Sequence, residues 1–193
     1  MRISAGKARG IVLNVPPGLA VRPTAGRSRQ SLFDSLGDLS GQTVLDLCAG
    51  SGGLGFEAAS RNAETVVFVE TMAKNIHIIE ENMEKVRSSG VETKFKIIKA
   101  DILQPSSFMG GSPVPDIIFC DPPYQCSAEY FSKFTDNEAF ASWAQEGLLI
   151  WELPQWRKKG LQFTQTGFWE TQKIRNFGGI EFLFLKASCS EEL

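Results

Sequence analysis

The stretch "TVLDLCAGSGGLGFEAASRN", residues 43–62, decides the fold. It begins with a short apolar run typical of a buried strand and ends with the composition of a helix. Between them, Gly50, Gly52 and Gly55 fit the pattern G-x-G-x-x-G, which allows a tight turn and lets a ligand lie against the backbone. Glu70 follows Gly50 by twenty residues, at the end of the next apolar run. A glycine turn between strand and helix, with an acid at that distance, predicts the cofactor-binding turn of an α/β fold.

The rest of the chain continues the alternation of strand and helix. Runs rich in Val, Ile and Leu alternate with segments of helical periodicity, which predicts a mostly parallel sheet with helices on both faces. The last two strand-like runs are joined by "NFGG" and predict an antiparallel pair. The expected helices span 24–39 (Thr24 a candidate N-cap), 53–62, 72–89 and 128–144; the expected strands span 43–49, 65–70, 94–100, 116–121, 147–153, 161–175 and 179–187; residues 104–115 are expected to be a loop.

Charge divides the chain into a basic arm and an acidic body. Residues 1–31 hold six Lys and Arg and no acid, and since the net charge is −2, an arm of +6 leaves −8 on the remainder. Such asymmetry fits either a nucleic-acid contact or a solvated N-terminal segment. The first fifteen residues predict a β-hairpin around "GKARG", with a basic tip. We therefore expect one domain, 1–193, with 1–31 as its basic extension of hairpin and linker.

Composition also limits the class of protein. No apolar run is long enough for a membrane span or a secretion signal, so we expect a cytoplasmic protein. The four cysteines form no CxxC pair and His77 is the only histidine, so we expect reduced thiols and no metal site. Nothing in the sequence demands more than a monomer.

Acidic residues at the strand ends distinguish between two cofactors. Asp46 lies four residues before Gly50, where it would repel the pyrophosphate of NAD but suits a ligand with an ammonium and a sulfonium. Glu70 suits the ribose hydroxyls of either cofactor. Asp101, after the third strand, is placed to accept a hydrogen bond from an adenine amino group. This arrangement favours S-adenosylmethionine.

The stretch "DIIFCDPPYQC", residues 116–126, carries the chemistry. Its strand is expected beside the first one, so that Asp121 projects from the edge where ligands bind in such sheets. Pro122 and Pro123 stiffen the chain and supply no N–H. What remains is a rigid pair of acceptors, the Asp121 carboxylate and the Pro122 carbonyl, next to the ring of Tyr124. On its own the motif also fits a plain strand terminator.

Two acceptors and an aromatic ring suit an exocyclic amine on a planar base. The acceptors hold both N–H groups and aim the nitrogen lone pair, while base–ring stacking typically contributes ~1–3 kcal/mol. The alkylated nitrogen is acidic and releases its proton readily, so no histidine base is required. The glycine turn and the Asp-Pro-Pro-Tyr motif together predict a methyl transfer to such an amine.

The chain resembles the RsmD family of bacterial small-subunit (16S) ribosomal RNA (guanine-N2)-methyltransferases. The stretches that carry the resemblance are "MRISAGKARG", "VRPTAGRSRQSLFDSL", "VLDLCAGSGGLGFEAASR", "VVFVE", "ADIL", "DIIFCDPPY" and "LLIWEL". The resemblance implies a Rossmann-like class I methyltransferase fold: a seven-stranded, mostly parallel sheet with the last strand antiparallel, plus the basic N-terminal β-hairpin. It implies S-adenosylmethionine as cofactor and ribosomal RNA, or the assembling small ribosomal subunit, as partner.

The resemblance also implies roles for individual residues. Gly26 departs from it, because the family commonly has an acid there. The implied cofactor-binding residues are Asp46, Cys48, Ala49, Gly50, Ser51, Gly52, Glu70, Thr71, Asp101 and Ile102; the implied catalytic residues are Asp121, Pro122, Pro123 and Tyr124; the implied RNA-binding residues are Arg2, Lys7, Arg9, Arg22, Thr24, Arg27 and Arg29.

Other functions remain open at this point. A DNA adenine-N6 methyltransferase uses similar Asp-Pro-Pro-Tyr chemistry, although such enzymes usually carry an extra target-reading segment. A protein-glutamine methyltransferase more often has Asn at the position of Asp121. A non-catalytic RNA-binding assembly factor with the same fold would not need the acceptor motif at all, and an NAD-dependent oxidoreductase leaves it without a role.

Overall fold

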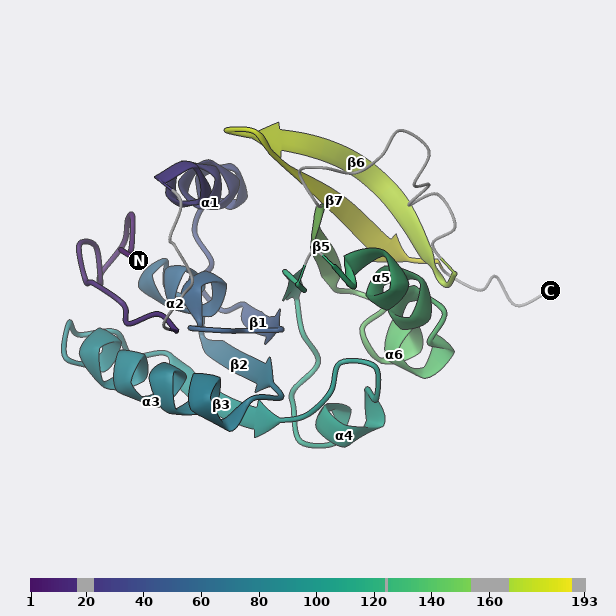
Figure 1. The fold of residues 1–193 in the computed structure, drawn as a ribbon, viewed down its shortest axis with the longest axis horizontal. Coiled ribbons are helices and arrows are strands. Elements are labelled where there is room, and N and C mark those ends of the chain that lie inside the picture. The colour runs from purple at the N-terminus through teal and green to yellow at the C-terminus, as the bar shows by residue number, and fades with distance from the viewer. Residues whose placement is uncertain (17–22, 124, 154–166, 189–193) are drawn as a thin grey trace.

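The computed structural model describes residues 1–16, 23–123, 125–153 and 167–188, apart from the side chains of residues 23–25. Its elements alternate along the chain much as the periodicity predicts (Figure 1). The helices are α1 (Pro23–Leu36), α2 (Gly53–Ser60), α3 (Ala73–Arg87), α4 (Ser106–Met109), α5 (Ser127–Thr135) and α6 (Glu138–Trp143); the strands are β1 (Thr43–Leu47), β2 (Thr65–Glu70), β3 (Lys94–Lys99), β4 (Ile117–Cys120), β5 (Leu148–Leu153), β6 (Trp169–Phe177) and β7 (Ile180–Ala187).

All seven strands form one sheet in the order β3-β2-β1-β4-β5-β7-β6. The first five are parallel, whereas β7 is antiparallel to both of its neighbours, β5 and β6. The predicted sheet, mostly parallel with the last strand antiparallel, is therefore confirmed. Its order reverses between β1 and β4, and in open α/β sheets ligands bind at such a switch point.

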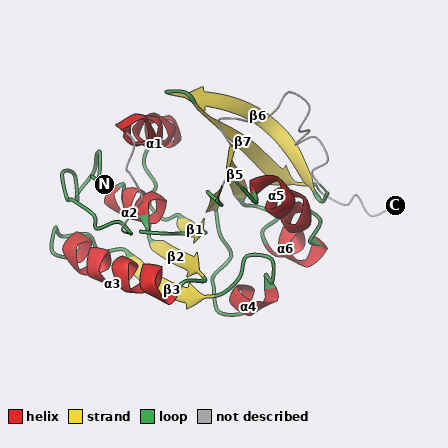
Figure 2. Cartoon of the chain, in the orientation of Figure 1, coloured by secondary structure: helices red, strands yellow, loops and turns green. Residues whose placement is uncertain are grey.

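Helices cover both faces of the sheet, as Figure 2 shows. On one face α1, α2, α3 and the first thirteen residues pack in a core that includes Phe33, Phe56 and Phe119. On the other face α4, α5 and α6 pack in a core around Phe134, Phe140 and Trp151. The central strands are buried on both sides, which explains their continuous apolar sequences. No helix among the described residues has the length and apolar character of a membrane span.

Several local predictions need correction. The helix expected over 128–144 is two helices, because the Asn137 side chain accepts from Phe140 N–H at 2.9 Å and caps a new helix. The loop expected over 104–115 contains the short helix α4. The α1 helix begins at Pro23, so Thr24 lies inside its first turn instead of capping it. The N-terminal hairpin pairs through main-chain bonds and a single bridge between Arg2 and Val12, without regular strands.

Candidate active site

The candidate site lies where β1 and β4 end side by side. Their residues pair in parallel up to Leu47 and Cys120, so the glycine turn after β1 and the Asp-Pro-Pro segment after β4 leave the sheet at the same edge. The sequence predicts this juxtaposition, and the strand pairing confirms it.

Left-handed backbone shapes the glycine turn. Cys48, Gly50 and Gly52 have φ values of 56°, 59° and 79°, a region that disfavours most side chains. Gly55 is required for a different reason, since a Cβ atom there would lie 2.3 Å from the Phe68 ring of β2. The first two glycines therefore allow the turn and the third allows α2 to pack closely on the sheet.

Asp46 lies beneath this turn and not on its open side. The residue is 2% exposed, and its Oδ2 accepts from the Gly55 N–H at 2.8 Å. Burial raises its pKa to about 8; the Gly55 bond opposes this shift and the nearby Glu70 carboxylate adds to it. Asp46 thus supports the first turn of α2 and brings negative charge below the turn when it ionises.

Glu70 links the ends of β1 and β2. Its Oε2 accepts from Gly50 N–H at 2.8 Å, and its Oε1 accepts from Thr71 N–H at 2.8 Å and Met72 N–H at 2.9 Å. Since a carboxylate has about four lone-pair sites, Oε2 keeps capacity for one more donor, such as a ribose hydroxyl. The carboxylate also fixes the spacing between the two loops.

The other predicted cofactor residues differ in accessibility. Asp101 is half-buried, and its Oδ1 accepts from Leu103 N–H at 2.9 Å, which leaves the second oxygen for another donor. The Ile102 side chain is 3% exposed in the core under β3, so only its main chain is available to a ligand. Thr71 is exposed, and Ala49 and Ser51 are each 8% exposed.

Asp121 stands among other carboxyl groups. Its residue is exposed at the end of β4, yet protein surrounds the carboxyl on its remaining sides. Partial loss of water, then Glu152, then Asp46 raise the pKa of Asp121 well above its usual range. No cation contributes to this shift among the residues that the structure describes. Such a carboxyl attracts a cationic ligand or a partner rich in N–H donors.

The two prolines after Asp121 have different roles. The Pro123 carbonyl accepts from Cys126 N–H at 3.0 Å and from its thiol at 3.3 Å, which ties this segment to the start of α5. Pro122 is buried, and its carbonyl accepts no hydrogen bond from the residues with a described position. Tyr124 lies outside the described residues.

These residues fit the predicted cofactor. A positively charged group placed at the β1–β4 edge would be attracted by the Asp121 carboxylate and, from beneath the turn, by Asp46 when it is ionised; burial raises the pKa of both groups. A free lone pair on Glu70 and a free oxygen on Asp101 stand at the ends of β2 and β3, where a ribose and an adenine would each find an acceptor.

The predicted RNA-binding residues differ in exposure. Lys7, Arg9 and Arg27 are exposed, and Arg2 is exposed with its guanidinium donating to the Gly10 carbonyl at 2.9 Å. Arg22 and the Thr24 side chain lie outside the described residues.

Arg29 is a correction to the sequence prediction. It is 8% exposed, pairs with the Glu57 carboxylate at 3.4 Å and donates to the Arg2 carbonyl at 2.8 Å. Its guanidinium is therefore committed to the interior of the protein. Alternation of charge along α1 could not reveal this, because the partner Glu57 comes from another helix.

Glu57 fastens the basic arm to the body. Fully buried on α2, it accepts from Ser4 N–H at 3.1 Å and from Ala5 N–H at 3.3 Å, and it pairs with Arg29 and Arg61. Removing one partner of such a buried network typically costs about 3–5 kcal/mol. The hairpin therefore has a fixed position along α2.

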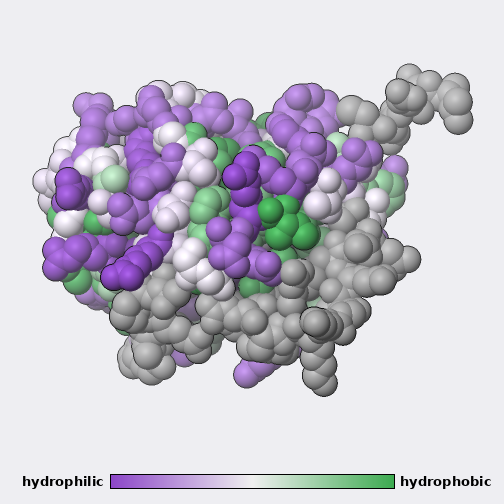
Figure 3. Space-filling view, turned by 90° about the horizontal axis from the view of Figure 1, so that it is seen from above, coloured by the Kyte–Doolittle hydropathy of each residue, from purple (hydrophilic) through white to green (hydrophobic). Residues whose placement is uncertain are grey.

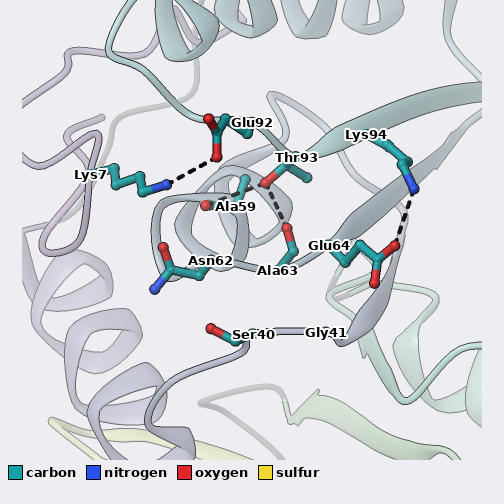
Figure 4. Close-up of a pocket in the computed structure, with 10 residues that line it drawn as sticks. All are labelled: Lys7, Ser40, Gly41, Ala59, Asn62, Ala63, Glu64, Glu92, Thr93 and Lys94. Carbon is teal, nitrogen blue, oxygen red and sulfur yellow. Dashed lines mark hydrogen bonds and ion pairs between the residues drawn. The ribbon is translucent and has the colours of Figure 1, made fainter.

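A polar pocket lies at the opposite edge of the sheet, where β1, β2 and β3 begin (Figure 4). Its charged residues pair with one another: Lys7 with Glu92 at 3.6 Å and Lys94 with Glu64 at 3.1 Å. It contains no residue of the glycine turn or of the Asp-Pro-Pro segment, so it is separate from the candidate active site. Within the described part of the chain, no three His, Cys, Asp or Glu side chains group closely enough to hold a metal ion.

Sequence reasoning missed two residues of the candidate site. Asn82 on α3 is fully buried and donates to the Ser51 carbonyl at 3.0 Å and the Asn14 carbonyl at 2.9 Å, so it links the glycine turn to the N-terminal arm. An amide on the apolar stripe of the helix, three residues after Ile79, is a signal that could have found it. Tyr130 on α5 lies close to Cys126, Asp101 and Cys48, and no pattern in the sequence marks it.

Comparison with known proteins supports the same family. The family model described as "Conserved hypothetical protein 95" matches residues 1–186. "Ribosomal RNA small subunit methyltransferase D" of Haemophilus influenzae is 34% identical over 154 residues, covering 78% of this chain and 77% of the relative. "Putative rRNA methyltransferase YlbH" of Bacillus subtilis is 32% identical over 131 residues, covering 65% of this chain and 67% of the relative.

A solved structure extends the similarity to nearly the whole chain. The structure named "Putative methyltransferase yhhF from Escherichia coli" has a TM-score of 0.74 at 26% identity and covers 98% of this chain and 99% of that one. The match includes the antiparallel last strand and the N-terminal arm, because almost no residue of either chain is left out. By its sequence, its sheet and its arm, the chain belongs to the RsmD family.

Proposed function

We propose that this protein is an S-adenosylmethionine-dependent methyltransferase that modifies the N2 amine of a guanine in small-subunit ribosomal RNA. The observation that carries the proposal is the exposed Asp121 carboxyl group after β4, beside the glycine turn, with the Pro122 carbonyl next to it in the chain. The names of the relatives from Haemophilus influenzae and Bacillus subtilis support ribosomal RNA as the substrate.

Different residues at the β1–β4 edge would have different roles. The glycine turn, Glu70 and Asp101 would hold S-adenosylmethionine, which when bound supplies an electrophilic methyl group and leaves as a thioether. Asp121 and the Pro122 carbonyl would each accept one N–H of the guanine amine, which aims the nitrogen lone pair. Fixing two reacting groups in this way contributes up to ~7–11 kcal/mol to lowering a barrier.

The amine loses one proton in the reaction. Once the nitrogen had accepted the methyl group from the bound cofactor it would be acidic, and its proton would pass to the Asp121 carboxylate or to water. A carboxylate with a raised pKa is a better proton acceptor than an ordinary aspartate. The ionised form of Asp121 is therefore the active one.

The test is methyl transfer from labelled cofactor to small-subunit ribosomal RNA that lacks the mark. We expect label on N2 of guanine after digestion to nucleosides, and none when Asp121→Ala replaces the wild type. Free RNA, partly assembled subunits and duplex DNA serve as parallel substrates. Label on adenine of DNA would favour the adenine-N6 alternative, and cofactor binding without transfer to any substrate would favour the assembly factor.

A further inference from the structure

The register of the sheet connects the candidate active site with its distant edge strand. The last pair of β4 and β5 is Cys120 with Trp151, and Asp121 and Glu152 come next in the chain. From Glu152 the row of paired residues continues to Phe182 on β7. It ends at Arg175 on β6. Since neighbouring strands lie ~4.8 Å apart, the backbone of Arg175 is roughly 14 Å from that of Asp121, a distance that a few nucleotides span.

Two cations of β6 point to the same face of the sheet as α1. Arg175 pairs with Phe182 and Lys173 pairs with Phe184, and both rings belong to the core on the α1 side. The Lys173 Nζ lies 4.8 Å from the centre of the Phe184 ring, on that face. Both cationic residues are nevertheless exposed.

The α1 helix lies beside the turn between β6 and β7, at Ser28. A Cβ atom on Gly178 of this turn would lie 3.0 Å from the Ser28 side-chain oxygen, so the two elements are in close contact. Arg27, the preceding residue, is exposed. Figure 1 shows α1 next to the end of β6, at the top of the molecule.

The cations near α1 and β6 differ from those of the N-terminal arm in their ion pairs. Among the described residues Arg27, Lys173 and Arg175 have no ion-pair partner, whereas Lys7 pairs with Glu92 at the opposite edge of the sheet. The first turn of α1 contains no acid, and neither does the row of β6 residues that faces α1. The view onto α1 and β6 shows a largely hydrophilic face with a small apolar area near its middle (Figure 3).

We propose that Arg27, Lys173 and Arg175, here called the α1–β6 surface, bind the phosphodiester backbone of the RNA strand next to the target base. The proposal rests on the proposed function and deepens it. Charge changes along the row of residues from Asp121 to Arg175. At one end the carboxyl groups of Asp121 and Glu152 suit an amine and a cationic cofactor, whereas at the other end Arg175 suits a phosphate. Arg and Lys contacts to phosphates set the register of a nucleic acid without reading its bases.

The test replaces the two β6 cations together, as Lys173→Gln with Arg175→Gln. The matched control is Lys94→Gln with Lys96→Gln, which removes two exposed lysines at the same spacing from β3, the other edge strand. Binding of a short single-stranded RNA with one central guanine is measured by fluorescence anisotropy at several salt concentrations. Thermal unfolding of each variant checks that the fold is kept.

Loss of two phosphate contacts lowers the salt slope of single-strand binding by about 1.4, so from ~50 to ~200 mM salt the wild type should lose about sevenfold more affinity than the β6 variant. The β3 control should keep the wild-type slope. A second variant, Lys173→Arg with Arg175→Lys, preserves both charges and should also keep it. Equal slopes for the β6 variant and the β3 control would overturn the proposal.

Methyl-transfer kinetics separate this proposal from the proposed function. For the β6 variant we expect a raised KM for RNA with an unchanged kcat, since phosphate contacts are made equally in the ground and transition states. A lowered kcat with unchanged KM would contradict the α1–β6 surface. A wild type that binds RNA with the expected salt slopes but transfers no methyl group would refute the proposed function and leave the surface supported.

Discussion

Asp46 and Asp121 have raised pKa values for different physical reasons. Asp46 is buried beneath the glycine turn, where the loss of water dominates. Asp121 is open on one side, and the carboxyl groups of Glu152 and Asp46 add to the loss of water on its other sides. The first aspartate therefore mainly affects stability, while the second is available for the reaction.

Asp121→Asn should test whether the negative charge of Asp121 is needed at the candidate active site, because the amide has nearly the same shape as the carboxylate. The amide keeps one acceptor oxygen but no negative charge, so we expect kcat to fall by about 10²-fold or more. Cofactor affinity, measured by calorimetry, should change much less. The wild type should lose activity as the pH falls through a value above the ordinary carboxyl range, because the pKa of Asp121 is raised and its ionised form is needed.

The Asn variant should lack this acidic limb of the pH profile. An identical limb in wild type and variant would assign the titration to another group, and full activity of the variant would contradict the proposed role of Asp121.

Asp46→Asn tests the buried carboxyl through stability. In the folded protein without cofactor Asp46 holds its proton up to a pKa of about 8, whereas the unfolded chain releases it near the ordinary value of 3.8. Between these values the folded state binds more protons, so the free energy of unfolding should fall as the pH rises. The amide does not titrate, and its Oδ1 can still accept from Gly55 N–H.

Urea unfolding of the cofactor-free proteins at about pH 5 and about pH 8 provides the measurement. The wild type should lose more stability than the variant over this interval. Parallel losses would mean that Asp46 is already ionised in the folded protein.

At the scale of elements, sequence patterns predict the strands of the sheet well. They predict poorly where helices break and which distant segments pack together. Apolar runs separated by helical periods predict the strands, their parallel order and the position of Asp121, because these depend on local pattern and on general rules of chain topology. The break between α5 and α6 depends on one side chain, Asn137, which the apolar periodicity of 128–144 conceals.

Contacts between distant segments explain the other misses. Glu57 binds residues 4 and 5, and Asn82 binds the carbonyls of Ser51 and Asn14. Each of these bonds joins segments about thirty or more residues apart. A pattern within one helix can mark such a polar residue as unusual, but it does not identify the partner.

Gly6→Ala should show how firmly the hairpin is attached. Gly6 has φ 81°, and a Cβ atom there would lie 1.8 Å from the Ser60 carbonyl oxygen. Gly37→Ala is the matched control, with φ 80° and open space around the new atom. Both variants suffer the backbone cost of about 1–2 kcal/mol, but only Gly6→Ala must displace the hairpin from α2.

Because the bonds from Lys7 N–H and Ala8 N–H to Ser60 would then be lost, we expect Gly6→Ala to cost about 2 kcal/mol more than the control in urea unfolding. Limited proteolysis should cut the arm of Gly6→Ala faster. Equal stabilities would mean that the hairpin is not closely docked.

On the scale of the whole molecule, positive charge is distributed differently from the expectation of one basic arm. Lys7 lies at the edge of the sheet opposite Asp121, and Arg29 is enclosed. Arg27 lies near the end of β6, on the same side as Lys173 and Arg175. Counting charges along the chain predicts the total of the arm, but not the face on which each charge lies.

Arg27→Gln and Arg29→Gln, two residues apart on α1, should affect different properties: the first RNA binding, the second stability. We expect Arg27→Gln to weaken RNA binding and flatten its salt slope by about 0.7, with little change in stability. Arg29→Gln should lower the free energy of unfolding by about 3 kcal/mol or more, because it leaves Glu57 with one buried cation fewer.

RNA binding by fluorescence anisotropy and urea unfolding of the same samples distinguish the two. A stable Arg29→Gln protein with weakened RNA binding would show that Arg29 contacts RNA after all and would contradict its structural role.

The position of β7 has a consequence for biosynthesis. β7 follows β6 in the chain but lies between β5 and β6 in the sheet, so β6 leaves the ribosome before its neighbour exists. The five strands from β3 to β5 can pair earlier, with the glycine turn and Asp121 already at their common edge. Because β6 pairs with β7 and lies at the edge of the sheet, Lys173 and Arg175 can take their places in it only once β7 has been made. A nascent chain halted before β7 would have the candidate active site at the β1–β4 edge, but Lys173 and Arg175, proposed to bind RNA, would not yet be fixed in the sheet.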